Sequence, residues 1–209
     1  IDFELYDNHP IDSKKLAAIL RQHTTLGFNS SNYDLPVIVA ALRGDTNAQI
    51  KQLSDDIINA PQVWPVLKKH KIVIPSAFDH IDIIEIPIGQ ASLKIYGGRL
   101  HAPKMQDLPI EPSALISPEQ RAILREYCHN DLEVTRLLYE ALKPQIELRE
   151  KMGAQYDLDL RSKSDAQIAE SVIKHELEAK DIDCSRKAVK AGTTYKYTMP
   201  KHLKFKSQL

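Results

Sequence analysis

Two places in the chain carry side chains whose types and spacing could do chemistry. The first is a polar turn, Asn29 to Asp34, which follows a β-favouring run and precedes an apolar helical run beginning at Leu35. A carboxylate at the mouth of a helix can cap free N–H groups or face a bound cation. Taken alone, Asp34 is more simply interpreted as a cap, although α/β enzymes also present acids at strand ends in this way.

The second place is the pair Tyr127 and Asp131, within a helix predicted to start at Pro118. Residues four apart lie on one face of a helix, one turn from each other. Tyr127 belongs to the apolar stripe of this helix, so Asp131 is expected at or beside the buried seam. A carboxylate there is costly unless it is paired, hydrogen-bonded or bound to metal. We therefore expect Asp131 to meet Asp34.

Together these residues resemble a known family. The pattern Asn29-(three residues)-Tyr33-Asp34, followed later by Tyr127-(three residues)-Asp131, resembles the second and third motifs of the DEDD, or DnaQ-like, 3′-to-5′ exonucleases. The tyrosine marks the Tyr subgroup. The stretches between the motifs resemble the proofreading exonuclease domain of family B DNA polymerases, especially those of phages, over roughly residues 3 to 143. The resemblance implies an α/β, ribonuclease H-like fold with a mixed sheet flanked by helices.

The resemblance also implies a role for each residue. In the family, two divalent cations about 4 Å apart assist an in-line phosphodiester displacement, and hard oxygen ligands suit Mg²⁺ or Mn²⁺. Asp131 would bind the metal that holds the nucleophilic water, and Asp34 would bind the second metal. Tyr127 would orient the attacking water. Asn29 and Tyr33 would lie near the substrate, with Asn29 alternatively bracing the turn.

The family's first motif, Asp-x-Glu on the first strand, has one match by letters, Asp2-Phe3-Glu4. Residues 5 to 23 leave no room for the two further strands that the fold needs. We therefore interpret Phe3 to Tyr6 as the third strand and expect the true first motif upstream, in a longer protein of which this is a piece. Asp2 and Glu4 remain the less favoured metal ligands. With half of its carboxylates, the chain is expected to bind metal weakly and to cleave slowly or not at all.

Other elements must position these residues. Turn signals, caps and periodicity predict three strands and several helices. The strands are Phe3 to Tyr6, Thr24 to Phe28 and Ile81 to Ile86. Helices are expected from Asp12 or Ser13, over Leu35 to Leu42, from Asp45 to Asn47 onward, over Ser92 to Tyr96, from Ser117 to about Leu142, and from Ser164. Pro144 is expected to bend or end the helix that carries Tyr127. Asp82, on an otherwise buried strand, is interpreted as a structural carboxylate.

The composition is ordinary for a globular protein, with 209 residues, 43% of them hydrophobic and 27% charged. We expect an exonuclease-like domain over 1–150, a helical extension over 151–185 and a basic segment over 186–209. The basic segment holds seven Lys or Arg and no Asp or Glu. Two interpretations stay open: it tracks a phosphate backbone, or it is a solvated tail or a strand leading into a following polymerase domain.

No apolar run reaches the length of about 18 residues that a membrane helix needs. Two distant cysteines, Cys128 and Cys184, indicate no disulfide framework, which favours the cytoplasm, that of a host cell if the protein is phage-encoded. The expected activity is 3′-to-5′ exonuclease proofreading at single-stranded DNA ends. A non-catalytic nucleic-acid-binding or scaffolding module and an exoribonuclease are the alternatives.

Overall fold

Two short strands pair in parallel at the centre of the described chain. The structure, a computed structural model, describes residues 1–6, 9–184, 192–194 and 196–198. Strand β1 (Thr25–Gly27) lies beside β2 (His80–Asp82), with Thr25 opposite His80 and Gly27 opposite Asp82. Parallel strands need a long crossover between them, and the helices between β1 and β2 supply it. The strand expected over residues 24 to 28 is therefore confirmed in shortened form.

Seven helices form in the described residues. They are α1 (Ser13–Gln22), α2 (Asp34–Arg43), α3 (Asn47–Asn59), α4 (Val63–Lys69), α5 (Leu93–Arg99), α6 (Pro118–Tyr156) and α7 (Asp165–Glu178). The caps expected from sequence start two of them. Asp12 accepts a hydrogen bond from the Lys15 amide at the start of α1 (3.0 Å). Ser117 and Gln120 form a reciprocal capping box at the start of α6.

The chain divides into two units, Ile1–Glu170 and Ser171–Leu209. The first unit contains β1, β2 and helices α1 to α6, and the division falls within the residues of α7. Most of the basic segment predicted over 186–209 lies outside the described residues. The domain boundaries predicted at 150 and 185 therefore stay predictions.

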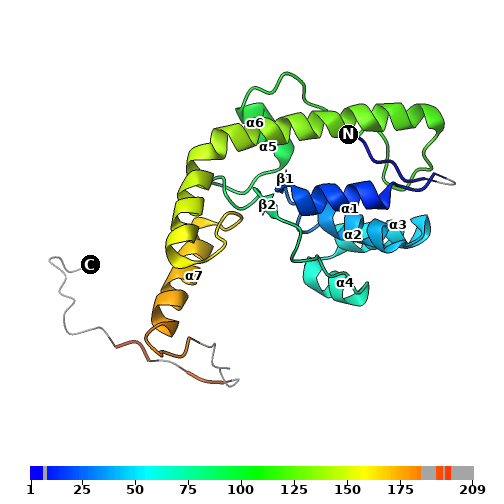
Figure 1. Ribbon diagram of the computed structural model, residues 1–209. Helices are drawn as coiled ribbons and strands as arrows, with labels where there is room; N and C mark the ends of the chain where they lie inside the picture. The colour runs from blue at the N-terminus through cyan, green and yellow to red at the C-terminus, as the bar shows by residue number, and fades with distance from the viewer. Residues whose placement is uncertain (7–8, 185–191, 195, 199–209) are drawn as a thin grey trace. The chain divides into compact units, whose positions relative to one another are not determined.

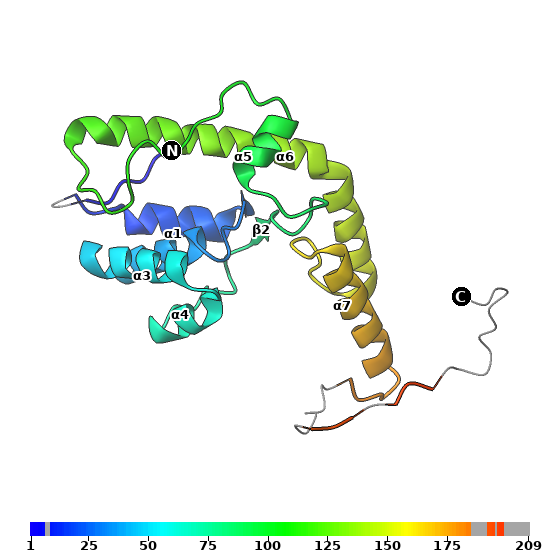
Figure 2. The same ribbon diagram turned by 180° about the vertical axis from the view of Figure 1, so that it is seen from behind.

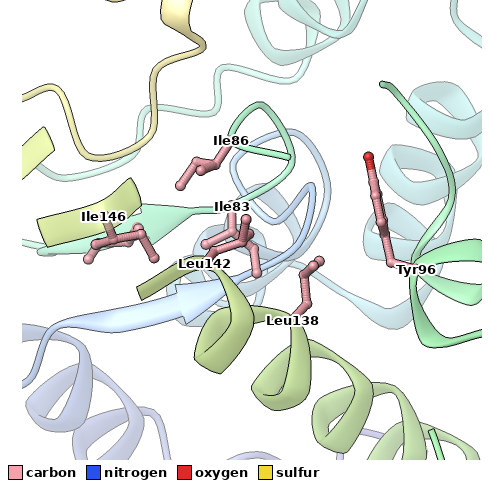
Figure 3. Close-up of a cluster of buried hydrophobic side chains, with 7 residues drawn as sticks. Ile83, Ile86, Tyr96, Leu138, Leu142 and Ile146 are labelled. Atoms are coloured by element: carbon pink, nitrogen blue, oxygen red, sulfur yellow. The ribbon is translucent and has the colours of Figure 1, made fainter. Parts of the chain in front are cut away.

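Two hydrophobic clusters form the core of the first unit, and β1 and β2 lie between the helices that build them (Figure 1). The first cluster joins β2 and the turn after it to α5 and α6, as Figure 3 shows. Its buried members are Ile81, Ile83, Ile86, Tyr96, Leu138, Leu142 and Ile146. The second joins α2, α3 and α4 through Ala40, Leu53, Ile57, Val66 and Ile72. The helical crossover thus carries its own core.

Two predicted strands differ from the structure. Residues 3 to 6 form no strand; Tyr6 makes one isolated antiparallel bridge to His9. Side chains of this segment contact α6 instead, because Arg125 ion-pairs with Glu4 and the Arg121 guanidinium stacks on the Tyr6 ring. The strand expected over residues 81 to 86 ends at Asp82. Beyond Ile83, whose amide still donates to the Gly27 carbonyl (2.9 Å), the backbone turns.

The helix α6 continues past Leu142, near which Pro144 was expected to bend or end it. Pro144 lies inside the helix, which runs on to Tyr156 and bends along its length (Figures 1 and 2). A proline in a helix interior removes a hydrogen bond and costs about 3 kcal/mol. Buried contacts on both sides of it, from Leu142 and Ile146, offset this cost.

Helix α5 also runs further than predicted, through Gly97 and Gly98 to Arg99. A Cβ atom at Gly97 would lie 3.0 Å from a methyl group of Val134, so the glycine lets α5 approach α6 closely. The α/β class is confirmed as a mixture of helices with a small parallel sheet. In the part of the chain that the structure describes, we find no helix with the length and apolar character needed to cross a membrane.

Candidate functional site

The carboxyl ends of the parallel strands β1 and β2 lie side by side, and Asp82, at the end of β2, binds the turn Asn29 to Asp34 that follows β1. We call this region the corner. The Asp82 side chain is only 4% exposed. Its carboxylate accepts hydrogen bonds from the backbone amides of Asn29 (2.8 Å), Ser31 (2.9 Å) and Ile84 (3.2 Å). A buried carboxylate is stable when several N–H groups donate to it. The structural role predicted for Asp82 is confirmed.

The turn after β1 is held in a specific conformation. Asn29 adopts a left-handed backbone (φ 57°), and its carboxamide oxygen accepts a hydrogen bond from the Asn32 side chain (2.9 Å). Asn29 therefore braces the turn, one of the two roles expected for it. The Tyr33 hydroxyl is hydrogen-bonded to Ser54 on α3 (2.8 Å), and its ring packs against the second hydrophobic cluster. Substrate contact by either residue stays a prediction.

Asp34 is the first residue of α2 and not its cap. The N-cap position belongs to Tyr33, whose side chain makes no capping hydrogen bond. Asp34 thus lies in the first helical turn, where the helix dipole favours negative charge. The residue is exposed overall, yet protein atoms around the carboxyl reduce its solvation and raise its pKa. The nearby charge of Asp82 raises that pKa further.

Tyr127 and Asp131 interact on α6 as their spacing predicts. The interaction with the Tyr127 hydroxyl by itself lowers the pKa of Asp131. Desolvation is the larger effect, so the pKa of Asp131 is raised overall. The pKa of Tyr127 is also raised, first by burial and then by the charge of Asp131. Tyr127 is therefore a protonated hydrogen-bond donor at neutral pH.

The thiol of Cys128, on α6, has a raised pKa. Burial around the sulfur is the main cause that raises the pKa of this thiol. The negative charges of Asp131, Asp34 and Asp2 raise it further, so all three lie within electrostatic range of the one thiol. Neither Asp34 nor Asp131 is among the groups that shift the pKa of the other, so the meeting of these two carboxylates stays a prediction. Across the described part of the chain, no group of three or more Asp, Glu, His and Cys side chains is close enough to hold a metal ion.

Asp2 and Glu4 differ from Asp34 and Asp131 because side chains of α6 bind their carboxylates. Asp2 is hydrogen-bonded to His129 Nε2 (2.8 Å), and Arg125 Nε donates to Glu4 (2.7 Å). The hydrogen bond from His129 is the main cause that lowers the pKa of Asp2. No described Lys or Arg forms an ion pair with Asp34 or Asp131. Of the four carboxylates considered as ligands, these two carry uncompensated charge.

Sequence reasoning missed the residues that fix the turn from the side of β2. His80 Nε2 is hydrogen-bonded to Ser30 Oγ (2.7 Å), and His80 Nδ1 to Thr25 Oγ1 (2.8 Å). Alternation along the strand His80-Ile81-Asp82 places His80 and Asp82 on one face, and this was the signal available. Their partners, about 50 residues earlier in the chain, leave no local trace in the sequence.

Comparison with known proteins found no relative. No protein-family model matches the chain, and neither the curated proteins nor the solved structures contain a match to it.

Proposed function

We propose that the chain carries a metal-dependent 3′-to-5′ exonuclease domain with a ribonuclease H-like fold, the proofreading part of a DNA polymerase, which acts on single-stranded DNA ends. One observation carries the proposal: Asp34, at the end of the β1 turn, and Asp131, on α6, both have raised pKa values and no ion-pair partner among the described Lys and Arg. Carboxyl groups with strongly shifted pKa values and no structural ion pair are candidates for a functional site.

The type of donor suits a hard divalent cation, whereas the number of donors, two carboxylates, is below the three or more that the described residues would need to group together. Both candidates offer carboxylate oxygens, which suit Mg²⁺ or Mn²⁺, and both have raised pKa values. A bound cation would compensate the charge that the protein leaves unpaired, and Asp34 and Asp131 would hold it. When bound, it would supply Lewis-acid stabilisation of the charge that develops on a phosphodiester during hydrolysis.

Tyr127 has a role that follows from its own surroundings. Its raised pKa keeps the hydroxyl protonated at neutral pH, so it acts as a hydrogen-bond donor and not as a general base. Asp131, one helical turn further along α6, and Tyr127 each shift the pKa of the other. The pair would position a water molecule or a phosphate oxygen beside the acids.

The test is a Mn²⁺ titration followed by electron paramagnetic resonance, with shortening of a 5′-labelled single-stranded DNA measured in parallel. Asp34→Asn and Asp131→Asn are each expected to weaken Mn²⁺ binding at least tenfold, since each removes a charged ligand. Asp55→Asn is the matched control, because it removes an exposed carboxylate that pairs with Lys51 on α3. Unchanged Mn²⁺ affinity in either Asp34→Asn or Asp131→Asn would refute the assignment.

A second candidate, a non-catalytic module that binds nucleic acid, is favoured by one observation. Glu4 is ion-paired with Arg125 and Asp2 is hydrogen-bonded to His129, which leaves two carboxylates without such partners in place of the family's four. This candidate predicts DNA binding without shortening of the strand. It also predicts tighter DNA binding in Asp34→Asn, because a negative charge is removed. A labelled RNA strand in the same assay distinguishes the exoribonuclease alternative.

A further inference from the structure

The position of Asp34 depends on the residue four places before it. The Ser30 carbonyl accepts a hydrogen bond from the Leu35 amide (2.8 Å), and this bond joins the turn to the first turn of α2. Asp34 lies between the two bonded residues. A displacement of Ser30 therefore moves the start of α2, and the Asp34 carboxylate moves with it.

Ser30 has little freedom to move towards β1. It is 4% exposed, and its hydroxyl lies against the backbone of Gly27: a Cβ atom built on Gly27 would be 2.3 Å from Ser30 Oγ. Such a contact is possible only with glycine at position 27. The remaining constraint on the hydroxyl is its 2.7 Å hydrogen bond to His80 Nε2.

His80 is itself fixed at both ring nitrogens. Its second nitrogen, Nδ1, is hydrogen-bonded to Thr25 Oγ1 (2.8 Å) within the paired strands. Burial is the main cause that lowers the pKa of the imidazole, so the ring is neutral at neutral pH, with one donor and one acceptor nitrogen. A serine and a threonine hydroxyl can serve as either partner. The ring thus connects the rigid strand pair, through Thr25, to the turn, through Ser30.

Asp82 and His80 hold different parts of the same turn. Asp82 accepts hydrogen bonds from backbone amides, so its contribution to the turn does not depend on which side chains the turn carries. His80 binds the side chain of Ser30, the residue whose backbone carbonyl contacts α2, so it fixes how far the turn is from the strand. We propose that His80 is a positioning residue: by holding the Ser30 hydroxyl, it sets the place of Asp34 and hence the affinity of the corner for a divalent cation. This inference rests on the proposed function, in which Asp34 is a ligand.

Two substitutions of His80 separate its two hydrogen bonds. The side-chain amide of Gln reaches the position of Nε2, and that of Asn reaches the position of Nδ1. His80→Gln therefore keeps the Ser30 contact, and His80→Asn keeps the Thr25 contact. His80→Asn is expected to weaken Mn²⁺ binding about tenfold, as loss of an outer hydrogen bond to a metal site does, whereas His80→Gln stays within about twofold of the unmodified chain.

The partners give a matched pair of controls. Ser30→Ala is expected to reproduce the weaker Mn²⁺ binding of His80→Asn, and Thr25→Val to leave the affinity unchanged, although each removes one hydroxyl from the same imidazole. Melting temperatures of all variants are recorded beside the titrations. Equal Mn²⁺ affinity in His80→Asn and His80→Gln, or in Ser30→Ala and Thr25→Val, would overturn the proposal.

A metal-free measurement separates this inference from the proposed function. Hydrogen exchange of the Leu35 amide reports the bond to the Ser30 carbonyl directly. Faster exchange is expected in Ser30→Ala and His80→Asn, and unchanged exchange in Thr25→Val and His80→Gln. If exchange follows this pattern but Asp34→Asn binds Mn²⁺ normally, the assignment of Asp34 as a ligand is wrong. If Asp34→Asn loses Mn²⁺ and exchange is the same in all variants, the role of His80 is wrong.

Discussion

The two sides of the candidate site are built by different forces. At the corner of β1 and β2, the buried Asp82 binds three backbone amides and His80 holds a buried serine. On the α6 side, Glu4 forms an ion pair with Arg125 and Asp2 a hydrogen bond with His129, all between partly exposed side chains. Exposed ion pairs contribute little to stability, whereas a buried acceptor with several donors contributes much. The comparison therefore predicts that substitutions at the corner lower the stability of the fold strongly, whereas substitutions on the α6 side lower it little.

The largest effect is expected from Asp82→Ala. The substitution leaves three backbone amides, those of Asn29, Ser31 and Ile84, without an acceptor. An unsatisfied buried donor costs about 1–3 kcal/mol, and these three are partly buried, so we expect a total loss of about 3 kcal/mol in the free energy of unfolding. Urea unfolding measures it. Asp107→Ala, which removes an exposed partner of Lys94, is the control and should change stability by less than about 1 kcal/mol. Similar losses in both variants would remove the distinction between the two kinds of carboxylate.

A smaller loss is expected from Gly27→Ala. The new methyl group would lie 2.3 Å from Ser30 Oγ, so the turn must shift away from β1. Overpacking of this kind costs about 1–3 kcal/mol. Gly98→Ala is the matched control. Gly98 lies inside α5, and its new methyl group would meet only the flexible end of the Met105 side chain (3.4 Å). Alanine is the better helix former by about 1 kcal/mol, so thermal unfolding should show opposite signs for the two substitutions.

The smallest effects concern the surface charges, and their signs differ. Asp34 and Asp131 have pKa values raised above 3.8, so the folded state binds their protons more tightly than the unfolded state does. Their contribution to stability falls as the pH rises through the folded pKa values. Asp34→Asn and Asp131→Asn should therefore raise the melting temperature at pH 7, an advantage that disappears below pH 3.8.

Asp2 provides the opposite case. Its pKa is lowered, mainly by the hydrogen bond from His129, so its stabilising contribution exists above the unfolded pKa and is lost as the pH falls through the folded one. Asp2→Asn should lower the melting temperature slightly at pH 7. The same sign for Asp2→Asn and Asp131→Asn would mean that charge compensation does not separate the two groups.

Local signals predicted the helix starts well. The caps at Asp12 and at Ser117 act within one turn, so their information lies in adjacent residues. The pairing of Tyr127 with Asp131 followed in the same way from helical spacing. The structural role of Asp82 followed from its place on a buried strand.

Tertiary contacts decided the features that the sequence analysis missed. Burial of Leu142 and Ile146 carries α6 through Pro144, against the local preference of proline. Contacts with Arg121 and Arg125 hold residues 3 to 6 on α6 in place of a strand. The bond between His80 and Ser30 joins residues 50 apart. None of these partners can be chosen from local periodicity, because many residues of the same type are available along the chain.

The parallel pairing of β1 with β2 has a consequence for how the protein folds. Thr25 and His80 are separated by 55 positions, and the whole crossover of α2, α3 and α4 must close before they meet. Contacts this distant in sequence slow folding, because the chain loses the entropy of the loop before the contacts form. The helices of the crossover carry their own hydrophobic cluster and can associate early. The turn that holds Asp34 is therefore expected to reach its final geometry in one of the last events of folding, when β2 docks.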